Sequence, residues 1–408
     1  MDVPYLPSLG AVDAVDGLEA FRVEARAWLE AHAPRRDPGD IPVPFSEATV
    51  DLEESRTWQR LLAEEGWAGI SWPIEYGGRG LGPVHEIVWA QEAARYRLPT
   101  DVFQIGLGMA GPTLITWGGA DQKRRWLPPL LRGDEIWCQL FSEPAAGSDL
   151  AAVKTRAVRR GNGWAVEGEK VWTSVAHLAD WGLLLARTDP EAPRHRGLTY
   201  FVIDMRQPGV EVRPLVQMTG TAGFNQVFFD SAWIPDDGVI GEVGAGWTVA
   251  LTTLMYERLA IGRALIGVEG AFEAIVDRLR RAEALARPTI RSRTVDLFVR
   301  GEVLRFMTQR IISRLAGGEI PTAEGSAAKL GLADLVIRAG SLVVDGLGPA
   351  GTTDRSRWSS LFLAGPGMRI AGGTDEILKN ALAERVLGLP REPRPEPGMP
   401  VSGPAPLS

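Results

Sequence analysis

Two short segments carry small, hydroxyl-bearing and aromatic residues in an arrangement that suits ligand binding. The first is Phe141–Asp149, which reads FSEPAAGSD, and the second, which follows after a short interval, is Glu169–Ser174, which reads EKVWTS. Small residues after a proline turn let the backbone approach a ligand closely, with several N–H and O–H donors pointing the same way. Either segment alone is better explained as a β-turn followed by a tryptophan-bearing strand. Their spacing within one strand-rich region favours a site for an anionic or carbonyl-rich cofactor, with a flavin as the first hypothesis.

The composition is that of a globular protein with more than one domain. A chain of 408 residues exceeds what one hydrophobic core usually holds, so two or three domains are expected. Hydrophobic residues make up 45% and charged residues 23%, which is ordinary for a folded chain. The net charge of -7 and the pI near 5.4 argue against a nucleic-acid partner, because a phosphate backbone requires a clustered basic face.

Cysteine, histidine and apolar residues limit the other possible classes. The only cysteine, Cys138, has no partner for an internal disulfide, and the N-terminus lacks a basic segment followed by an apolar one. The longest apolar runs, such as Trp181–Ala186, are too short to cross a bilayer. Four histidines and one cysteine offer no paired zinc ligands. The sequence therefore predicts a cytoplasmic protein without a metal site or a membrane span.

Hydrophobic periodicity divides the chain into three parts and a tail. Apolar residues recur at helical spacing up to about Gly133, alternate as in strands between about Glu135 and Gly246, and return to helical spacing up to Leu387. The predicted fold is mainly α with a central β-domain. It comprises a helical N-terminal domain (1–134), a β-barrel-like middle domain (135–246), a C-terminal domain like a four-helix bundle (247–390) and a disordered, proline-rich tail (391–408).

Local turn signals refine this division. Gly161–Gly163 predicts a hairpin turn between strands at Arg156–Arg160 and Trp164–Val166, and further strands are expected at Trp181–Ala186 and Leu198–Asp204. No Gly-x-Gly-x-x-Gly segment opens a helix after a strand, so a Rossmann-type nucleotide site is not expected.

The order of parts and four motifs resemble the acyl-CoA dehydrogenase family of flavoproteins over nearly the whole chain. The motifs are Leu62–Trp67 leading to Trp72–Gly78, Ser142–Asp149, Gly168–Ser174, and Gly372–Ile377 with Ala383–Pro390. Each is moderately specific alone, whereas four in the right order are strong. The resemblance implies FAD as the cofactor and an acyl-CoA thioester as the substrate.

The resemblance also assigns residues to the cofactor. The Phe141–Ser142 pair would lie at the flavin pyrimidine edge, with the Ser142 hydroxyl donating to it, and Gly147–Ser148 would lie by the pyrophosphate or the CoA of the substrate. Trp172 would cover one face of the isoalloxazine ring, with Ser174 near its N5. Thr374 and Glu376 would contact the FAD phosphates or adenosine. Alternatively, Trp172 is a core tryptophan, and Thr374 and Glu376 are a pair that caps the last helix.

The catalytic base is expected at Glu257. Much of the family places a glutamate directly before the C-terminal Gly-Thr, but Gly372 occupies that position here. Members that resemble isovaleryl- and long-chain acyl-CoA dehydrogenases place the base on an early helix of the last domain, next to an arginine. This sequence reads Tyr256-Glu257-Arg258 there. By the resemblance, Glu257 removes the α proton while the β hydride passes to flavin N5, and the backbone N–H at Gly372 and a flavin ribityl hydroxyl bind the thioester oxygen.

Helical spacing gives Glu257 independent support. It lies on or beside the apolar stripe of Trp247, Leu251 and Leu254, and an inward-facing carboxylate is costly unless something pairs with it or uses it. The alternative is that Glu257 pairs with Arg258 or another cation at a subunit surface. Tyr256 and Arg258 are then expected to shape the substrate pocket.

Two family signatures of the subunit interface are absent or altered. Arg287 or Arg291 is the candidate for the cation that reaches FAD across a subunit interface, while Asp345–Pro349 does not match the family's Gln-x-x-Gly-Gly. The resemblance implies a homo- or heterotetramer, with an electron-transfer flavoprotein as the electron acceptor.

Two rival functions remain at this point: a flavin oxidase or monooxygenase on the same scaffold, and a catalytically silent subunit of a hetero-complex. The acyl group stays open among short branched, long straight and steroid-derived thioesters.

Overall fold

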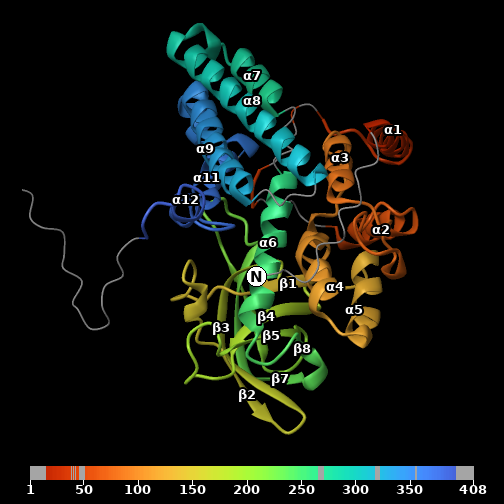
Figure 1. The fold of residues 1–408 in the computed structure, drawn as a ribbon. Helices are drawn as coiled ribbons and strands as arrows, with labels where there is room; N and C mark the ends of the chain where they lie inside the picture. The colour runs from red at the N-terminus through yellow and green to blue at the C-terminus, as the bar shows by residue number, and fades with distance from the viewer. Residues whose placement is uncertain are drawn as a thin grey trace, which may run out of the picture.

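The chain folds into a helical layer, a curled sheet and a second set of helices around one long central helix (Figure 1). The structure is a computed structural model that describes residues 15–37, 39, 41, 43–45, 51–264, 271–317, 322–353 and 356–391. The predicted fold class, mainly helical with a central β-domain, is confirmed. The predicted disordered tail lies outside the described residues, apart from Arg391.

The N-terminal part is helical and its helix ends follow local sequence signals. Its helices are α1 (Val15–His32), α2 (Leu52–Glu64), α3 (Pro83–Ala93), α4 (Gly111–Trp117) and α5 (Ala120–Arg132), with short turns η1 (Ile74–Tyr76), η2 (Asp101–Phe103) and η3 (Gly106–Ala110). The Asp51 carboxylate caps α2 by accepting bonds from the N–H groups of Glu53 and Glu54, both at 3.1 Å. Gly133, with φ of 72°, ends α5 in the left-handed conformation that glycine adopts readily.

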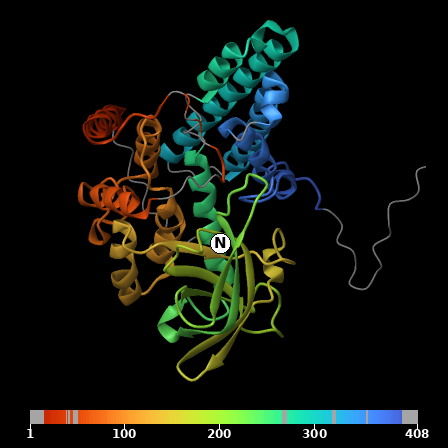
Figure 2. The same cartoon turned by 180° about the vertical axis from the view of Figure 1, so that it is seen from behind.

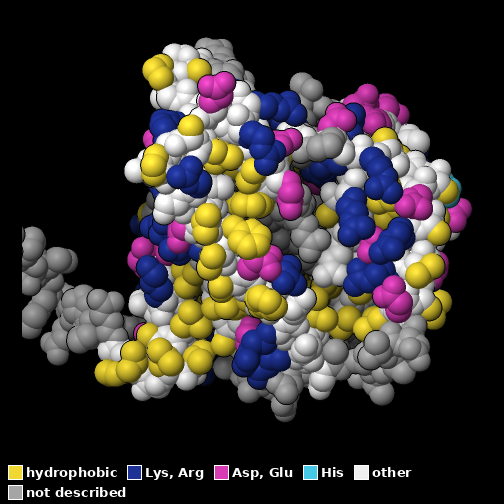
Figure 3. All heavy atoms as spheres, turned by 90° about the horizontal axis from the view of Figure 1, so that it is seen from above, with side chains coloured by type: hydrophobic (Ala, Val, Ile, Leu, Met, Phe, Trp, Pro, Cys, Tyr) yellow, Lys and Arg dark blue, Asp and Glu magenta, His cyan; other side chains and the backbone are white. Residues whose placement is uncertain are grey.

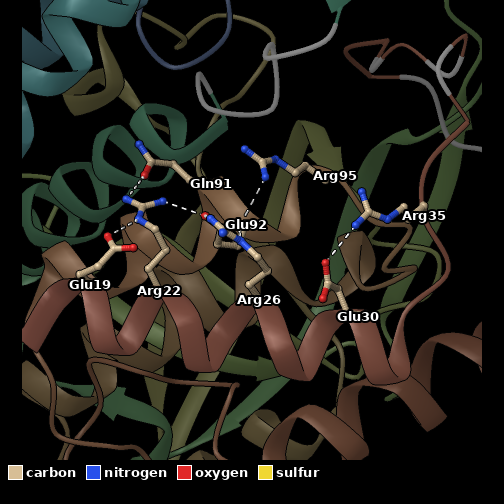
Figure 4. Close-up of polar contacts among 8 residues, drawn as sticks. All are labelled: Glu19, Arg22, Arg26, Glu30, Arg35, Gln91, Glu92 and Arg95. Carbon is tan, nitrogen blue, oxygen red and sulfur yellow. Dashed lines mark hydrogen bonds and ion pairs between the residues drawn. The ribbon is translucent and has the colours of Figure 1, made fainter.

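A buried carboxylate joins α1 to α3 (Figure 4). Glu92 accepts from Arg22 Nη1 at 2.8 Å and from Arg26 Nε at 3.0 Å. Arg95 Nη1, in the turn that follows α3, lies 3.8 Å from Glu92 Oε2. Burial opposes ionisation of Glu92, but the Arg26 and Arg22 guanidinium groups hold the pKa of its carboxyl below the ordinary value. This charge network thus ties α1 to α3.

The middle part is one curled, mainly antiparallel sheet. Its strands are β1 (Trp137–Leu140), β2 (Arg156–Arg160), β3 (Gly163–Ser174), β4 (Trp181–Arg187), β5 (Leu198–Asp204), β6 (Val210–Leu215), β7 (Phe224–Pro235) and β8 (Val239–Ile240), with η4 (Leu150–Ala152) and η5 (Asp236–Gly238) between strands. The order is β6-β7-β3-β2-β4-β5-β8, and β1 pairs in parallel with β4. The predicted hairpin is confirmed, because Arg160 pairs with Gly163 across the turn.

The C-terminal part is helical and connects to the sheet through α6, which runs vertically through the centre of the molecule in both ribbon views (Figures 1 and 2). Its helices are α6 (Gly246–Ala264), α7 (Ala271–Arg281), α8 (Pro288–Ala316), α9 (Thr322–Leu347), α10 (Pro349–Thr353), α11 (Arg357–Met368) and α12 (Asp375–Arg385), with η7 (Ala284–Ala286) before α8. One hydrophobic core includes residues of α4, α5, the sheet and α6, so α6 is held by both flanking parts.

The long helix α8 leaves an apolar stripe uncovered. One face packs on α9 through Leu297 and Leu304. Another face carries five large apolar side chains that are about half exposed and, apart from the adjacent pair Phe298 and Val299, follow one another at three or four residues: Val295, Phe298, Val299, Val303 and Phe306. Seen from above, hydrophobic side chains gather among charged ones on the half of the molecule formed by the C-terminal helices (Figure 3). A stripe of this kind is typical of a helix that packs against another protein surface.

Candidate active site

A seam of hydroxyl groups fixes the rotation of α6. Thr253 Oγ1 lies 2.9 Å from Tyr200 Oη of β5 and 3.0 Å from Thr113 Oγ1 of α4, and all three side chains are buried. One residue earlier, Thr252 Oγ1 accepts a bond of 3.0 Å from Trp117 Nε1. Because residues four apart lie on one helical face, Tyr256 and Glu257 continue the faces of Thr252 and Thr253 by one turn.

The Glu257 side chain is half-buried and contacts the sheet. Gln139 Nε2, from β1, donates to Glu257 Oε2 at 3.4 Å. The neighbouring Tyr256 Oη lies 3.4 Å from Thr116 Oγ1 on α4. Gln139 stands three residues before Ser142, so its contact brings the expected base to the strand that leads into the first motif. The side chain of Arg258 lies outside the described residues.

The first motif forms a turn built around a buried ion pair. Lys170 of β3 is fully buried, and its Nζ donates to the Phe141 carbonyl at 2.9 Å and to Glu143 Oε1 at 2.8 Å. Glu143 also accepts from the N–H groups of Lys154 and Thr155, at 2.6 Å and 2.9 Å. Burial lowers the pKa of Lys170 to about 8, although Glu143 opposes the shift. Burial would raise the pKa of the Glu143 carboxyl, but Lys170 and the two amides hold that pKa below its ordinary value.

The second motif ends in an irregular strand that exposes its tryptophan. Trp172 has a φ of 60°, at a point where the pairing register of β3 and β7 shifts. Its indole is 60% exposed and meets Phe224 edge-on, with ring centroids 5.8 Å apart. Trp172 is therefore not a core tryptophan, and its ring is free to cover a flat ligand. Ser174 lies two residues further along the strand, opposite Phe224.

The last motif forms a glycine turn held by a second buried lysine. Gly372 and Gly373 have φ of 66° and 89°, a conformation that glycine adopts without strain. Lys329 of α9 is 4% exposed, and its Nζ donates to the Gly373 carbonyl at 2.8 Å and to Asp375 Oδ1 at 3.3 Å. Arg369 Nε lies 3.7 Å from the other Asp375 oxygen. Burial lowers the pKa of Lys329, although Asp375 opposes the shift.

Thr374 closes this turn as the cap of α12. Its Oγ1 accepts from the N–H of Ile377 at 3.2 Å, while Glu376 is exposed in the first turn of the helix. The capping role expected of Thr374 is thus present, and a role toward a cofactor phosphate is compatible with it. Helix α12 lies where the C-terminal helices approach the sheet (Figures 1 and 2).

Several donors in these turns have no acceptor among the residues that the structure describes. The hydroxyls of Ser142, Ser148 and Ser174 make no hydrogen bond to any described residue, although the Ser142 carbonyl accepts from Val171 N–H at 2.9 Å. The N–H groups of residues 372–374 also have no acceptor in the described part of the chain. Ser148 and the preceding Gly147 are exposed, while Phe141 is buried against Tyr200. Hydroxyls and amides without an acceptor among the described residues, together with an exposed indole, fit a carbonyl-rich, phosphate-bearing cofactor such as FAD.

Arg287, the expected cation for the cofactor, is engaged within its own domain. Its Nη2 donates to the carbonyls of Asp345 and Gly346, at 3.0 Å and 2.5 Å, at the C-terminal end of α9. This contact satisfies helix-end carbonyls that otherwise lack donors. Arg291 Nη1 likewise donates to the Leu285 carbonyl at 3.2 Å. Neither arginine is brought to the other candidate residues within this one chain.

The described residues form neither a metal-binding cluster nor a membrane-spanning helix. No cluster of three or more His, Cys, Asp and Glu side chains in them has the geometry to bind a metal ion. No helix in that part of the chain combines the length and apolar character needed to span a membrane.

The chain matches known proteins along its whole folded length. Residues 16–134, 138–232 and 244–387 match the models of the N-terminal, middle and C-terminal domains of acyl-CoA dehydrogenases. Acyl-CoA dehydrogenase IpdE1 of Mycobacterium tuberculosis (strain ATCC 25618 / H37Rv) is 39% identical over 384 residues, which cover 92% of this chain and 98% of that relative.

Two solved structures share the fold. The structure described as "Tcur3481-Tcur3483 steroid ACAD" has a TM-score of 0.80 and 27% identity, covering 93% of this chain and all of that one. The ChsE4-ChsE5 complex from Mycobacterium tuberculosis has a TM-score of 0.75 and 25% identity, with 93% of this chain covered and all of that one.

The fold is that of an FAD-dependent oxidoreductase. The matches are more specific: this chain belongs to the acyl-CoA dehydrogenase family. It is an enzyme of lipid metabolism that dehydrogenates an acyl-CoA thioester with FAD as its cofactor. The expected family, enzyme class and cofactor are confirmed.

Sequence reasoning did not assign a role to three residues that shape the site. Gln139 has no local signal, because only folding brings it to Glu257. Lys170 was part of a recognised motif, but its partner Glu143 is distant in sequence. Lys329 could have been flagged, since it stands alone as a charge in the apolar stretch Ala327–Leu332.

Proposed function

We propose that Glu257 is the base that removes the α proton of a bound acyl-CoA thioester. The observation that carries this proposal is its place on α6, half-buried and in contact with Gln139 of the strand that leads to the Ser142 turn. The corresponding residue before Gly373-Thr374 is a glycine, which has no side chain to act as a base.

The residues of this chain divide the chemistry between them. Bound FAD would supply a hydride acceptor for the β carbon. The N–H of Gly372 is a donor for the thioester oxygen, which acidifies the α proton and lowers the demand on Glu257. The Ser142 and Ser174 hydroxyls are donors for the ring edge, Gly147 and Ser148 lie in a turn suited to phosphate, and Trp172 excludes water from one face.

The decisive experiment is anaerobic reduction of the bound flavin by an acyl-CoA, followed as loss of its visible absorbance. Wild-type protein should bleach without oxygen. Glu257→Gln keeps the shape of the side chain but removes the base, so flavin should remain bound while its reduction slows by at least about 10²-fold. Reduction at the wild-type rate in this variant would disprove the assignment.

A matched control is available in the sheet. Glu169 is likewise held by a glutamine, since Gln226 Nε2 donates to Glu169 Oε2 at 2.7 Å. Glu169→Gln should therefore reduce its flavin at close to the wild-type rate. The same experiment separates the rival functions, because turnover that requires oxygen indicates an oxidase and a purified protein without flavin indicates a silent subunit.

The acyl group we infer is bulky and steroid-derived. The support is the similarity to a structure whose description calls it a steroid ACAD, at 27% identity over nearly the whole chain. A thermal-shift panel of steroid-derived, short branched and long straight CoA thioesters tests this inference, since a ligand that binds only the native state raises the melting temperature. The largest shift with a straight-chain or short branched thioester would contradict it.

We further infer that the protein assembles through the exposed apolar stripe of α8, and we expect a tetramer. We also infer that an electron-transfer flavoprotein is the acceptor of its electrons. Two similar structures are described as pairs of different chains, so a heterotetramer is included. Arg287 and Arg291 point to their own domain, so that a cation for FAD from this region would have to come from another subunit. The native mass of the protein expressed alone separates a homotetramer from a chain that awaits a partner.

A further inference from the structure

Lys329 has contacts that the proposed chemistry does not yet use. It is a nearly fully buried cation on α9, and it binds a loop carbonyl as well as a carboxylate. A cation that served only to neutralise Asp375 would not need the Gly373 carbonyl. The carbonyl contact, at 2.8 Å, is also the shorter of the two, the carboxylate contact being 3.3 Å.

The Gly373 contact fixes the direction of a peptide plane. In a trans peptide the C=O and the following N–H point in opposite directions. When the Gly373 carbonyl points to Lys329, the N–H of Thr374 therefore points away from α9. Two glycines at positive φ offer little steric resistance to a flip of this peptide plane, because they have no side chains. The bond from Lys329 supplies the missing restraint.

The same turn presents three successive amides. The N–H groups of residues 372–374 have no acceptor among the described residues, while Asp375 N–H closes the loop on the Arg369 carbonyl at 3.0 Å. Successive free amides in a turn of this kind converge on a negatively charged or carbonyl oxygen. Lys329 fixes the plane of the Thr374 amide directly, and it restrains the Gly372 and Gly373 amides only through the backbone of this short turn.

We propose that Lys329 is a positioning residue, which orients the amides of Gly372–Thr374 toward the thioester oxygen and the cofactor by binding the Gly373 carbonyl. The inference rests on the proposed function, because it assumes that the Gly372 amide receives the thioester oxygen. It predicts that losing Lys329 slows removal of the α proton more than it weakens substrate binding.

The test measures proton removal apart from hydride transfer. A CoA thioester without β hydrogens cannot reduce the flavin, but its α protons can exchange with deuterium from the solvent. In Lys329→Met, exchange per bound FAD and kcat with a full substrate should both fall about 10- to 100-fold, below the loss of a whole oxyanion donor, while KM changes little. Lys329→Arg should recover most of the exchange, because a guanidinium can also donate to both oxygens.

Two further variants keep the test decisive. Lys379→Met removes an exposed lysine from α12 and should leave exchange and kcat unchanged. Lys329→Gln is polar and uncharged, so it tests the role if the Met variant does not fold. It should show the same loss, because its shorter amide does not reach the carbonyl. Wild-type exchange per bound FAD in a folded Lys329→Met or Lys329→Gln overturns the proposal.

The outcome is separable from failure of the proposed function. If Glu257→Gln exchanges α protons at the wild-type rate, the base is wrong whatever Lys329 does. If Glu257→Gln is inactive but the Lys329 variants exchange normally, only the positioning role is wrong.

Discussion

Two turns border the candidate site, and each is held by a buried lysine that binds one carbonyl and one carboxylate of the turn. Lys170 holds the Phe141–Glu143 turn from a strand of the same domain, and Lys329 holds the Gly373–Asp375 turn from another helix. The Glu143 carboxylate also accepts from two backbone amides, whereas among the described residues the further partner of the Asp375 carboxylate is Arg369, at 3.7 Å.

The difference indicates that the two turns have different mechanical roles. The first is rigid because charge, backbone amides and the sheet all restrain the same few atoms. In the second, the Gly373 carbonyl is held by one lysine contact between two glycines at positive φ, and the turn is closed by the bond from Asp375 N–H to the Arg369 carbonyl at 3.0 Å. We therefore expect the turn proposed to receive the flavin ring to be fixed, and the turn proposed to receive the thioester to be able to adjust.

The largest effect is expected when the rigid turn loses its cation. Lys170→Met leaves the Glu143 carboxylate buried with only the two amides, which should cost about 3–5 kcal/mol of stability and release flavin. Chemical denaturation at fixed FAD concentration, with flavin content read from absorbance, measures both effects. Adding Glu143→Gln to Lys170→Met should restore part of the stability, because no unpaired charge then remains. Wild-type stability in the single variant would remove the contrast between the two turns.

A third buried carboxylate, Glu92, is held by two arginines instead of a lysine, and its removal tests whether such an ion pair also stabilises the fold. Glu92 is bound by Arg22 and Arg26 (Figure 4), and Glu92→Gln should lower stability at neutral pH by about 2–3 kcal/mol. The folded pKa of Glu92 lies below its ordinary value of 4.5. Its contribution is therefore complete above pH 4.5 and is lost as the pH falls through the folded pKa. The stability gap between wild type and variant should narrow below pH 4.5, and a gap that widens there would contradict the ion-pair account. Flavin content should not change, unlike in Lys170→Met.

The contrast between the turns also shows what the sequence could reveal. The three-part fold and the hairpin at Gly161–Gly163 were predictable, because helical and strand periodicities and a turn signal are local. The strand β1 was not predicted, since Trp137–Leu140 is short and takes its conformation from parallel pairing with β4. Thr374 was recognisable as a helix cap from its position alone.

Contacts between distant segments were beyond local reasoning. Glu257 was identified from a family pattern and a helical stripe, but Gln139 lies 118 residues away and only the packed fold brings it close. Leu251 was placed on the same inward stripe, but its side chain is 40% exposed, so neighbouring elements leave that side of α6 incompletely covered. The partners of Lys170 and Lys329 were hidden for the same reason.

The smallest effect is expected from the backbone of the adjustable turn. Gly373→Ala adds a Cβ that meets Leu378 at ordinary distances, 3.5 Å to Cδ2 and 3.7 Å to Cγ. Its cost is therefore the strain of a φ of 89°, about 1–2 kcal/mol. Gly147→Ala, in the segment that follows the rigid turn, is the matched control: its φ is not positive and no heavy atom lies within 4 Å of the added Cβ. That variant should change stability by less than about 0.5 kcal/mol in chemical denaturation. The strain in Gly373→Ala favours a flipped peptide plane, so this variant should also exchange α protons more slowly. When Lys329→Met is combined with it, the loss of exchange should be smaller than the sum of the two separate losses. Independent, additive losses would mean that the lysine and the glycines do not act on the same peptide plane.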